Sequence, residues 1–266
     1  MISKKCLLML PFLLLLVSQA IAEDEDLNTQ LMRATVKISH DKSTATGFVL
    51  SNEKGYILVT AAHVFDNTPG DGTTIVFRSQ QAEGEYTKEP TKLVIRKEGK
   101  PIWQKHPTED VAVIGITPPQ NADLPRLSTE LLATDEQLRT HKVHPGEKVV
   151  SIGFPHRVEG SKAGFPLLRD GTIASFPLLP TIKTKTFYLS ANTFEGDSGG
   201  PVYLSRPNRL EPDKEETRLI VGLVSAQQFL DEEAKMIYGT SKIRHRLGFA
   251  VVVHASLIRE TIDLLK

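Results

Sequence analysis

The sequence lacks a disulfide framework, because Cys6 is the only cysteine among its 266 residues. Many small secreted domains depend on such a framework, so this chain must be stable through its core alone. It also lacks an excess of charge, with 32 basic and 32 acidic residues, and this balance does not favour nucleic-acid binding. Only the N-terminus carries a long apolar run, so no second segment suggests a membrane span.

The N-terminal segment has the pattern of a secretory signal peptide. A short basic start precedes an apolar run over residues 6–17, and Ala20-Ile21-Ala22 forms a small-x-small cleavage site. A membrane anchor is the alternative interpretation, but the run is short for a bilayer. We therefore expect removal of residues 1–22 and export of residues 23–266, with no membrane attachment afterwards. Periplasm and medium both remain open.

The expected mature chain has no cysteine. Removal of the signal also removes two lysines, which leaves 30 basic residues against 32 acidic ones. Export without disulfides favours a bacterial protein over an animal one. The length is compatible with one or two structural units.

Short strand-like runs dominate the first half of this chain. Residues 23–33 are acidic and polar and are expected to form a loose lead-in. The alternation of Ala34 to Ser39 is typical of a half-buried strand, and turn-rich residues 51–55 predict a hairpin. Strands are expected at 34–39, 46–50, 56–60, 73–77, 91–95 and 110–116. Six strands without a convincing helix predict a small closed antiparallel barrel over about 34–116.

A second strand series follows a proline-containing linker at 117–145. A short helix is expected in this linker, around Thr129 to Leu138. The series predicts a second barrel over about 146–253. Its strands are expected at 148–154, 168–176, 185–190, 201–204, 219–225 and 248–253. Apolar residues on one face predict a C-terminal helix at 256–265, with Ser256 as its N-cap.

One serine stands in an unusual setting. Glu195-Gly196-Asp197-Ser198-Gly199-Gly200-Pro201 places it among small residues, where the backbone turns sharply and a substrate can approach. A serine hydroxyl is a poor nucleophile without a nearby base. Thr60-Ala61-Ala62-His63 lies upstream, and Asp110-Val111-Ala112-Val113 lies between the two motifs. Together these motifs resemble those of the chymotrypsin-fold (trypsin-like) serine peptidases, whose order is also His, Asp, Ser.

This resemblance covers most of residues 34–262 and implies a fold and an activity. The fold would be all-β, with two six-stranded antiparallel barrels and a C-terminal helix. The activity would be that of an exported serine endopeptidase acting on polypeptides, with its site in the cleft between the barrels. Ser198 would attack the peptide carbonyl and form an acyl-enzyme, His63 would act as base and then acid, and Asp110 would orient His63. The sequence leaves no region for the C-terminal peptide-binding (PDZ) module of longer HtrA-type proteases.

Other interpretations of these residues exist. Ser198 alone could be a simple loop serine. Glu109 competes with Asp110, but in an alternating strand the two side chains would point to opposite faces. Asp66 and Asp123 are further candidates without the apolar run that follows Asp110.

No metal or other cofactor is expected. His141 and His144 could form a metal pair, but no cysteine or acidic cluster accompanies them. The remaining histidines lack the sequence context of His63.

The resemblance also implies an oxyanion hole made by the backbone N–H groups of Gly196 and Ser198. A residue without Cβ lets the chain turn its N–H toward the substrate. In animal relatives, the acid at the position of Asp197 pairs with a new N-terminus released by cleavage. No such activation site is present, so either Asp197 has another cation or activation takes another route. We expect that no pro-segment must be removed.

The specificity pocket is also placed by resemblance. Its base would be Asn192 with Thr193 beside it, and its wall would be Ser225, Ala226 and Gln227. The wall strand would also pair with the substrate backbone. Because Asn192 is not an acid, and Gln227 stands where many relatives have glycine, we expect small or medium uncharged side chains at the cleaved position.

Residues 228–247 form an insertion relative to this family. Acidic residues are followed by basic ones. A mobile flap over the pocket is one interpretation, and a solvated surface loop is the favoured one.

Two rival functions remain open. One is an inactive binding or scaffold protein that keeps the fold. The other is a protease that is active only with a partner or as an oligomer. The sequence leaves the oligomeric state undetermined.

Overall fold

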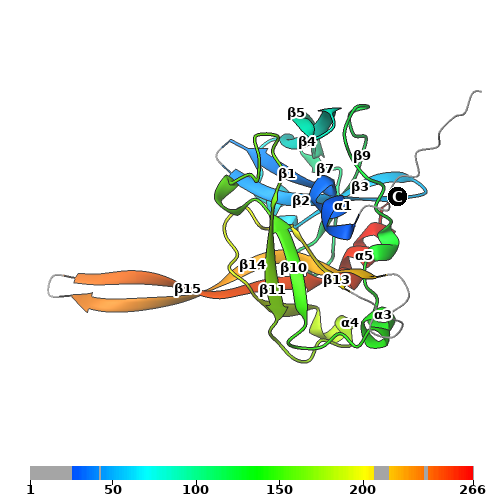
Figure 1. Cartoon of the computed structure of the whole chain (residues 1–266). Helices are drawn as coiled ribbons and strands as arrows, with labels where there is room; N and C mark the ends of the chain where they lie inside the picture. The colour runs from blue at the N-terminus through cyan, green and yellow to red at the C-terminus, as the bar shows by residue number, and fades with distance from the viewer. Residues whose placement is uncertain (1–25, 42, 207–215, 237–238, 266) are drawn as a thin grey trace, which may run out of the picture.

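The computed structural model describes residues 26–41, 43–206, 216–236 and 239–265 (Figure 1). The predicted signal segment therefore lies outside the described residues. Within these ranges, no helix combines the length and the apolar character needed to cross a membrane.

The first sheet contains seven strands in the order β5-β4-β1-β2-β3-β9-β8. Their bounds are β1 Thr35–His40, β2 Ser43–Asn52, β3 Gly55–Thr60, β4 Gly72–Ala82, β5 Glu85–Val94, β8 Gln104–Lys105 and β9 Ala112–Ile116. A separate hairpin joins β6 Arg96–Lys97 to β7 Lys100–Pro101. The expected six strands thus become seven, because the short β8 pairs with β9 at one edge.

The second sheet is a closed six-stranded barrel, as predicted. Its order is β10-β11-β12-β15-β14-β13, and the pairing of β10 with β13 closes it. The bounds are β10 Lys148–Gly153, β11 Leu167–Ile173, β12 Thr186–Ser190, β13 Pro201–Arg206, β14 Thr217–Met236 and β15 Gly239–His254. The all-β fold class with a C-terminal helix is confirmed.

The loose lead-in expected at 23–33 is wrong for residues 27–33, which belong to helix α1 (Leu27–Ala34). Asp26 caps this helix by accepting hydrogen bonds from the backbone of the first turn. Leu27, Leu31 and Ala34 are fully buried, at the spacing of one helical face. Packing of this face against the core, rather than composition, stabilises the helix.

The remaining helices are short. They are α2 Ala62–Asp66, the 3₁₀ turns η1 Thr129–Leu131 and η2 Pro155–Arg157, α3 Asp135–Thr140, α4 Thr181–Thr184 and α5 Ala255–Asp263. The single linker helix expected at 129–138 is wrong, because two pieces occupy the region. A capping box of Thr134 and Gln137 starts α3 separately.

The predicted cap of the C-terminal helix is also wrong. The N-cap of α5 is His254, which makes no side-chain capping bond. Ser256 lies inside the helix and donates its hydroxyl to Thr181 Oγ1 at 2.8 Å. Leu257 and Ile258 are buried against the core, as the apolar pattern indicates.

Within the insertion predicted at 228–247, residues 228–236 and 239–247 are neither the flap nor the surface loop expected from sequence. They continue β14 and β15 as a two-stranded ribbon that projects from the barrel (Figure 1). Opposite charges face each other across it, including Asp231 with Arg244 and Glu232 with His245. Such cross-strand pairs stabilise strands that composition alone does not favour.

The first sheet and the second barrel are joined through a buried arginine. Arg78 is 1% exposed and donates to the carbonyls of Arg33, Thr35 and Gly164. Its guanidinium also stacks on the ring of Phe165 at 4.6 Å. Burial lowers the pKa of Arg78 to about 10, so the group stays charged at neutral pH.

Candidate active site

His63 is held by two hydrogen bonds to one carboxylate. The one-turn helix α2 starts just after β3 and carries His63. Its backbone N–H donates to Asp110 Oδ1 at 2.9 Å, and its Nδ1 lies 2.8 Å from Asp110 Oδ2. A carboxylate only accepts, so Nδ1 carries the proton and Nε2 is left as the basic nitrogen.

The strand alternation expected at Glu109 and Asp110 is wrong, because β9 begins at Ala112 and both acids precede it. Contacts separate them instead. Glu109 binds Lys185 Nζ at 2.9 Å and accepts from the Thr108 hydroxyl, away from His63. Asp110 alone of the two contacts the histidine.

A third group completes this network. The hydroxyl of Ser225 donates to Asp110 Oδ2 at 2.5 Å. Burial alone would raise the pKa of Asp110, but the hydrogen bonds from His63 and Ser225 hold it below its ordinary value. Asp110 is therefore an anion at neutral pH. From sequence, Ser225 was predicted only as part of the pocket wall, since 115 residues separate it from Asp110.

Ser198 lies in a turn fixed by backbone hydrogen bonds. Its carbonyl accepts from Thr46 N–H at 2.9 Å, and Gly199 N–H donates to the Val224 carbonyl at 2.7 Å. The Ser198 hydroxyl points to the carbonyl of Ser225 at 3.4 Å. Among the described contacts, no hydrogen bond joins it to His63. Both residues line one hollow of about 250 Å³.

Gly196 occupies a position that only glycine tolerates. Its φ is +103°, and an added Cβ would lie 2.2 Å from the carbonyl oxygen of Phe154. The preceding carbonyl, of Glu195, is turned away and accepts from His156 N–H at 2.7 Å. Within the described part of the chain, the N–H groups of Gly196 and Ser198 donate to no protein acceptor. Both donors are available to a ligand.

Asp197 has a cation that the sequence did not reveal. Its Oδ1 lies 2.5 Å from Arg169 Nη2, and its Oδ2 accepts from Phe194 N–H at 2.7 Å. Burial raises the pKa of Asp197 above its ordinary value, while Arg169 and the N–H bond act in the opposite direction. Arg169 stands in β11, 28 residues earlier, so no local motif marks it.

The expected pocket residues gather around β15. Arg169 also donates to the Asn192 carbonyl at 2.9 Å, and Gly248 faces the side chain of Asn192. Thr193 is 5% exposed, and its hydroxyl has no partner among the described residues. Gln227 pairs with Ala250 of the neighbouring strand. Asn192 and Gln227 thus lie beside the Gly248–Ala250 part of β15.

No metal centre emerges in the described ranges, which contain no group of three or more His, Cys, Asp or Glu side chains placed to hold an ion. His141 lies near the Thr217 hydroxyl, and His144 lies beside Glu147.

A closed β-barrel beside a second β-sheet, with a histidine–carboxylate pair next to a serine in a glycine turn, defines the chymotrypsin class of hydrolase. A family model described as a trypsin-like peptidase domain matches residues 45–210, and the chain belongs to this family. It is therefore a serine protease whose substrates are peptides.

Two solved structures are similar to this chain at low identity, and the first of them shows the same fold. The HtrA-type protease AlgW, solved with a tripeptide, is 16% identical with a TM-score of 0.52; the match covers 90% of this chain and 62% of that one. Rv3671c from M. tuberculosis, solved as a serine-to-alanine mutant in an inactive form, is 17% identical with a TM-score of 0.49, covering 89% and 88%. A search of curated proteins finds no match.

Proposed function

We propose that this protease hydrolyses peptide bonds through an acyl-enzyme on Ser198, with His63 as base and Asp110 as its orienting acid. The observation that carries the proposal is the double hydrogen bond between His63 and Asp110. It leaves Nε2 of His63 free to take the proton of the Ser198 hydroxyl. The same nitrogen then returns this proton to the leaving amine.

The N–H groups of Gly196 and Ser198 are proposed to stabilise the negative oxygen of the tetrahedral intermediate. Support comes from the Glu195 carbonyl, which His156 holds away from these donors. Removal of one such donor typically costs about 3–4 kcal/mol of barrier. For this reaction, the Ser198 side chain turns away from the Ser225 carbonyl, and catalytic hydrogen bonds often tighten only when substrate binds.

Activation is proposed to need no cleavage beyond removal of residues 1–22 on export. The ion pair with Arg169 already gives Asp197 the cation that a new N-terminus supplies in animal relatives. Asp26, the cap of α1, would remain four residues inside a chain that starts at residue 23. We expect a protein of residues 23–266 to be active as purified. Activity that arises only after a further N-terminal cut would contradict this.

Cleavage is proposed to follow small or medium uncharged residues. The proposed pocket base, Asn192, has no charge, and the buried hydroxyl of Thr193 lacks a partner among the described residues. A buried polar group without a partner favours ligands that can satisfy it. A peptide-library profile tests this, and a strong preference for Lys, Arg, Asp or Glu would contradict it.

The proposed nucleophile is tested by intact-mass spectrometry of residues 23–266 after treatment with a fluorophosphonate. We expect one adduct on the wild-type protein and none on Ser198→Ala. Thr140→Ala is a matched control, because it removes an exposed hydroxyl at the end of α3, outside the triad and the pocket, and should leave the adduct in place.

The rival functions give different results in this experiment. A folded protein that forms no adduct under any condition would support an inactive scaffold. An adduct rate that rises with protein concentration would instead support activation by self-association, which orders the site.

A further inference from the structure

Strand β14 has an edge that its own sheet does not cover. Its 20 residues run from the barrel core to the tip of the ribbon. On one side, β13 pairs with it as far as Leu223, and the Gly199–Gly200 backbone then bonds Val224. Beyond Val224, no described strand pairs with this side, while β15 continues to pair with the other. Past this point, this edge has no described strand partner; only the Ser225 carbonyl is contacted there, by the Ser198 hydroxyl, and register shifts at Val224/Ala226 and Gln227/Phe229 interrupt the alternation.

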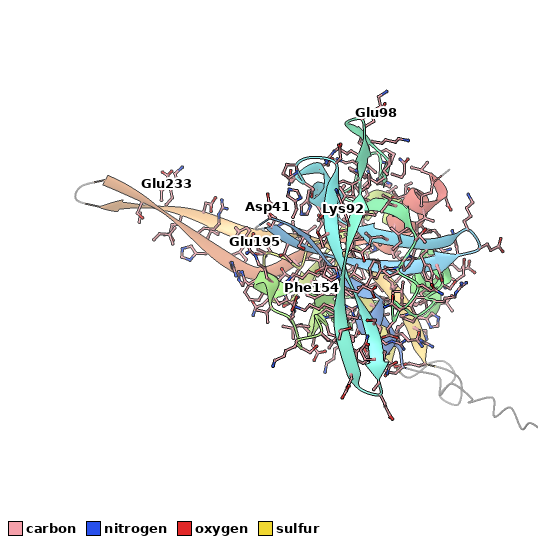
Figure 2. All side chains as sticks on the ribbon, turned by 90° about the horizontal axis from the view of Figure 1, so that it is seen from above. Asp41, Lys92, Glu98, Phe154, Glu195 and Glu233 are labelled. Carbon is pink, nitrogen blue, oxygen red and sulfur yellow. The ribbon has the colours of Figure 1, made fainter. Side chains whose placement is uncertain are left out.

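This open edge begins where the proposed substrate strand would bind. Residues 225–227 are the segment expected to pair with the substrate backbone before the scissile bond. Residues 228–236 extend the same strand by about 30 Å at the usual rise per residue. Figure 2 shows Glu195, beside the oxyanion donors, near the root of the ribbon, and Glu233 far out along it. A substrate that leaves the site along β14 meets the ribbon next.

The root of the ribbon is attached to the active-site wall. The guanidinium of Arg246, on β15, stacks on the Phe194 ring at 5.0 Å. His156 packs on the same ring, with centroids 5.0 Å apart. Phe194 precedes Glu195 and donates its N–H to Asp197. The ribbon is thus anchored to the residues that shape the proposed oxyanion hole.

The outer ribbon is ordered by contacts across its two strands. Arg244 binds both carboxylate oxygens of Asp231, at 2.7 and 2.8 Å, and stacks on Phe229 at 5.1 Å. Leu230 and Ile243 remain 54% and 42% exposed. An ordered strand with an open edge and exposed apolar side chains has the properties of a template for an extended chain.

We propose that residues 228–236 of β14 bind the polypeptide substrate well upstream of the scissile bond, by adding it as a strand to the open edge. This inference rests on the proposed function, because residues 225–227 set the direction of the substrate. The enzyme then acts best on long extended segments. Asp231, Glu232 and Glu233 of this strand are already paired with Arg244, His245 and Lys242 of β15, so the added segment is recognised through its backbone rather than its charge.

Binding to the inactive Ser198→Ala protein tests the inference without any need for catalysis. Two fluorescent peptides share one cleavage sequence and carry about four or about twelve residues before the scissile bond, enough to reach or pass residue 227. In fluorescence anisotropy, we expect the long peptide to bind about tenfold tighter or more. Equal affinities would overturn the inference.

Backbone methylation gives a sharper signature. Two versions of the long peptide carry N-methyl groups on alternate upstream residues, in complementary registers. In an added strand, only every second N–H faces β14, so one register should abolish the length advantage and the other should keep it. Equal effects of the two registers would contradict strand addition.

A shortened ribbon provides the matched variant. Replacing residues 230–245 by Asn-Gly keeps the Phe229–Arg246 pair and closes the hairpin with a two-residue turn. In the Ser198→Ala background, this variant should bind both peptides with the affinity of the short one. A long peptide that still binds about tenfold tighter to the shortened protein would place its contacts elsewhere.

The outcomes separate this inference from the proposed function. Absence of a fluorophosphonate adduct on the wild-type protein with its ribbon intact would refute the proposed nucleophile, while the anisotropy ratio is read on Ser198→Ala.

Sedimentation tests whether a second copy of this chain, rather than the substrate, occupies the open edge of β14. A dimer that the ribbon deletion abolishes and the long peptide does not displace would assign the edge to a second copy, and it would overturn the inference.

Discussion

At the residue scale, two carboxylates beside the proposed nucleophile lie in opposite environments. Asp110 receives hydrogen bonds from His63 and Ser225, which outweigh its burial and keep its pKa low. Asp197 is 1% exposed, and its burial outweighs the effect of Arg169, so its pKa is raised. The first carboxylate orients a base. The second fixes the turn that contains Gly196 and Ser198, and it depends on one cation.

Removal of that cation should disable the site. In Arg169→Ala, Asp197 keeps its buried position without an ion-pair partner, and breaking a buried pair in this way costs about 3–5 kcal/mol. We expect kcat/KM on a peptide substrate to fall by about 100-fold or more, together with a lower melting temperature.

Arg169→Lys is the matched control for this loss. It keeps the charge but not both contacts of the guanidinium, to Asp197 and to the Asn192 carbonyl, so we expect intermediate activity. Full activity of Arg169→Ala would mean that the turn is held by its backbone hydrogen bonds alone.

Local motifs and long-range contacts differ in how far the sequence predicts them. The family motifs point to His63, Asp110 and Ser198 because each lies in a recognisable run of neighbours. The contact of Ser225 with Asp110 and that of Arg169 with Asp197 span 115 and 28 residues. Both contacts depend on how the strands pair in space, so no local sequence pattern predicts them.

At the scale of elements, the segment between β10 and β11 is clamped to the first sheet. Glu159 accepts from Lys37 at 3.0 Å and also pairs with Lys88. Phe165 packs edge-on against Tyr86 at 5.1 Å and lies under the guanidinium of Arg78. This segment carries His156, whose N–H holds the Glu195 carbonyl away from the proposed oxyanion donors.

Loosening the clamp should therefore affect catalysis more than binding. In Phe165→Ala, the ring contacts to Tyr86 and Arg78 are lost, and the His156 segment is less well fixed. We expect kcat to fall by about tenfold with KM changed by less than about threefold, because the oxyanion donors act in the transition state. Steady-state kinetics on one peptide substrate measures both constants.

Phe176→Ala is the control for this variant, since Phe176 is 83% exposed. It should leave both constants unchanged. If Phe165→Ala instead raised KM by about tenfold and left kcat unchanged, the clamp would act in substrate binding.

Elements were predicted well where apolar alternation marks a buried strand and poorly where it does not. The barrel strands were predicted well because their apolar residues alternate in this way. Helix α1 was missed because its burial rests on Leu27, Leu31 and Ala34 within a polar stretch. The ribbon was missed because its strands carry charges that pair only across the hairpin, as Asp231 does with Arg244.

At the scale of the whole molecule, one buried histidine couples the fold to pH. His254 ends β15 and precedes α5, and it is 2% exposed. Its ring packs on Phe187 at 4.8 Å, and neither ring nitrogen has a partner among the described residues. Burial lowers the pKa of His254 to about 4, so the folded protein holds it neutral over most of the acid range.

This burial should make the fold less stable in mild acid. The unfolded chain binds a proton at His254 below about pH 6.5, whereas the folded chain does so only near the lowered pKa of about 4. Unfolded protein thus holds more protons between these values, and stability falls as the pH drops through this window, by about 3 kcal/mol at most.

In His254→Leu, urea unfolding at pH 7 and pH 4.5 should show a pH dependence smaller by about 2–3 kcal/mol. His245→Gln, on the exposed ribbon, should retain the wild-type dependence, because His245 is solvated and remote from the core. An unchanged pH dependence in His254→Leu would mean that other groups, among them the carboxylates paired at the site, dominate acid unfolding.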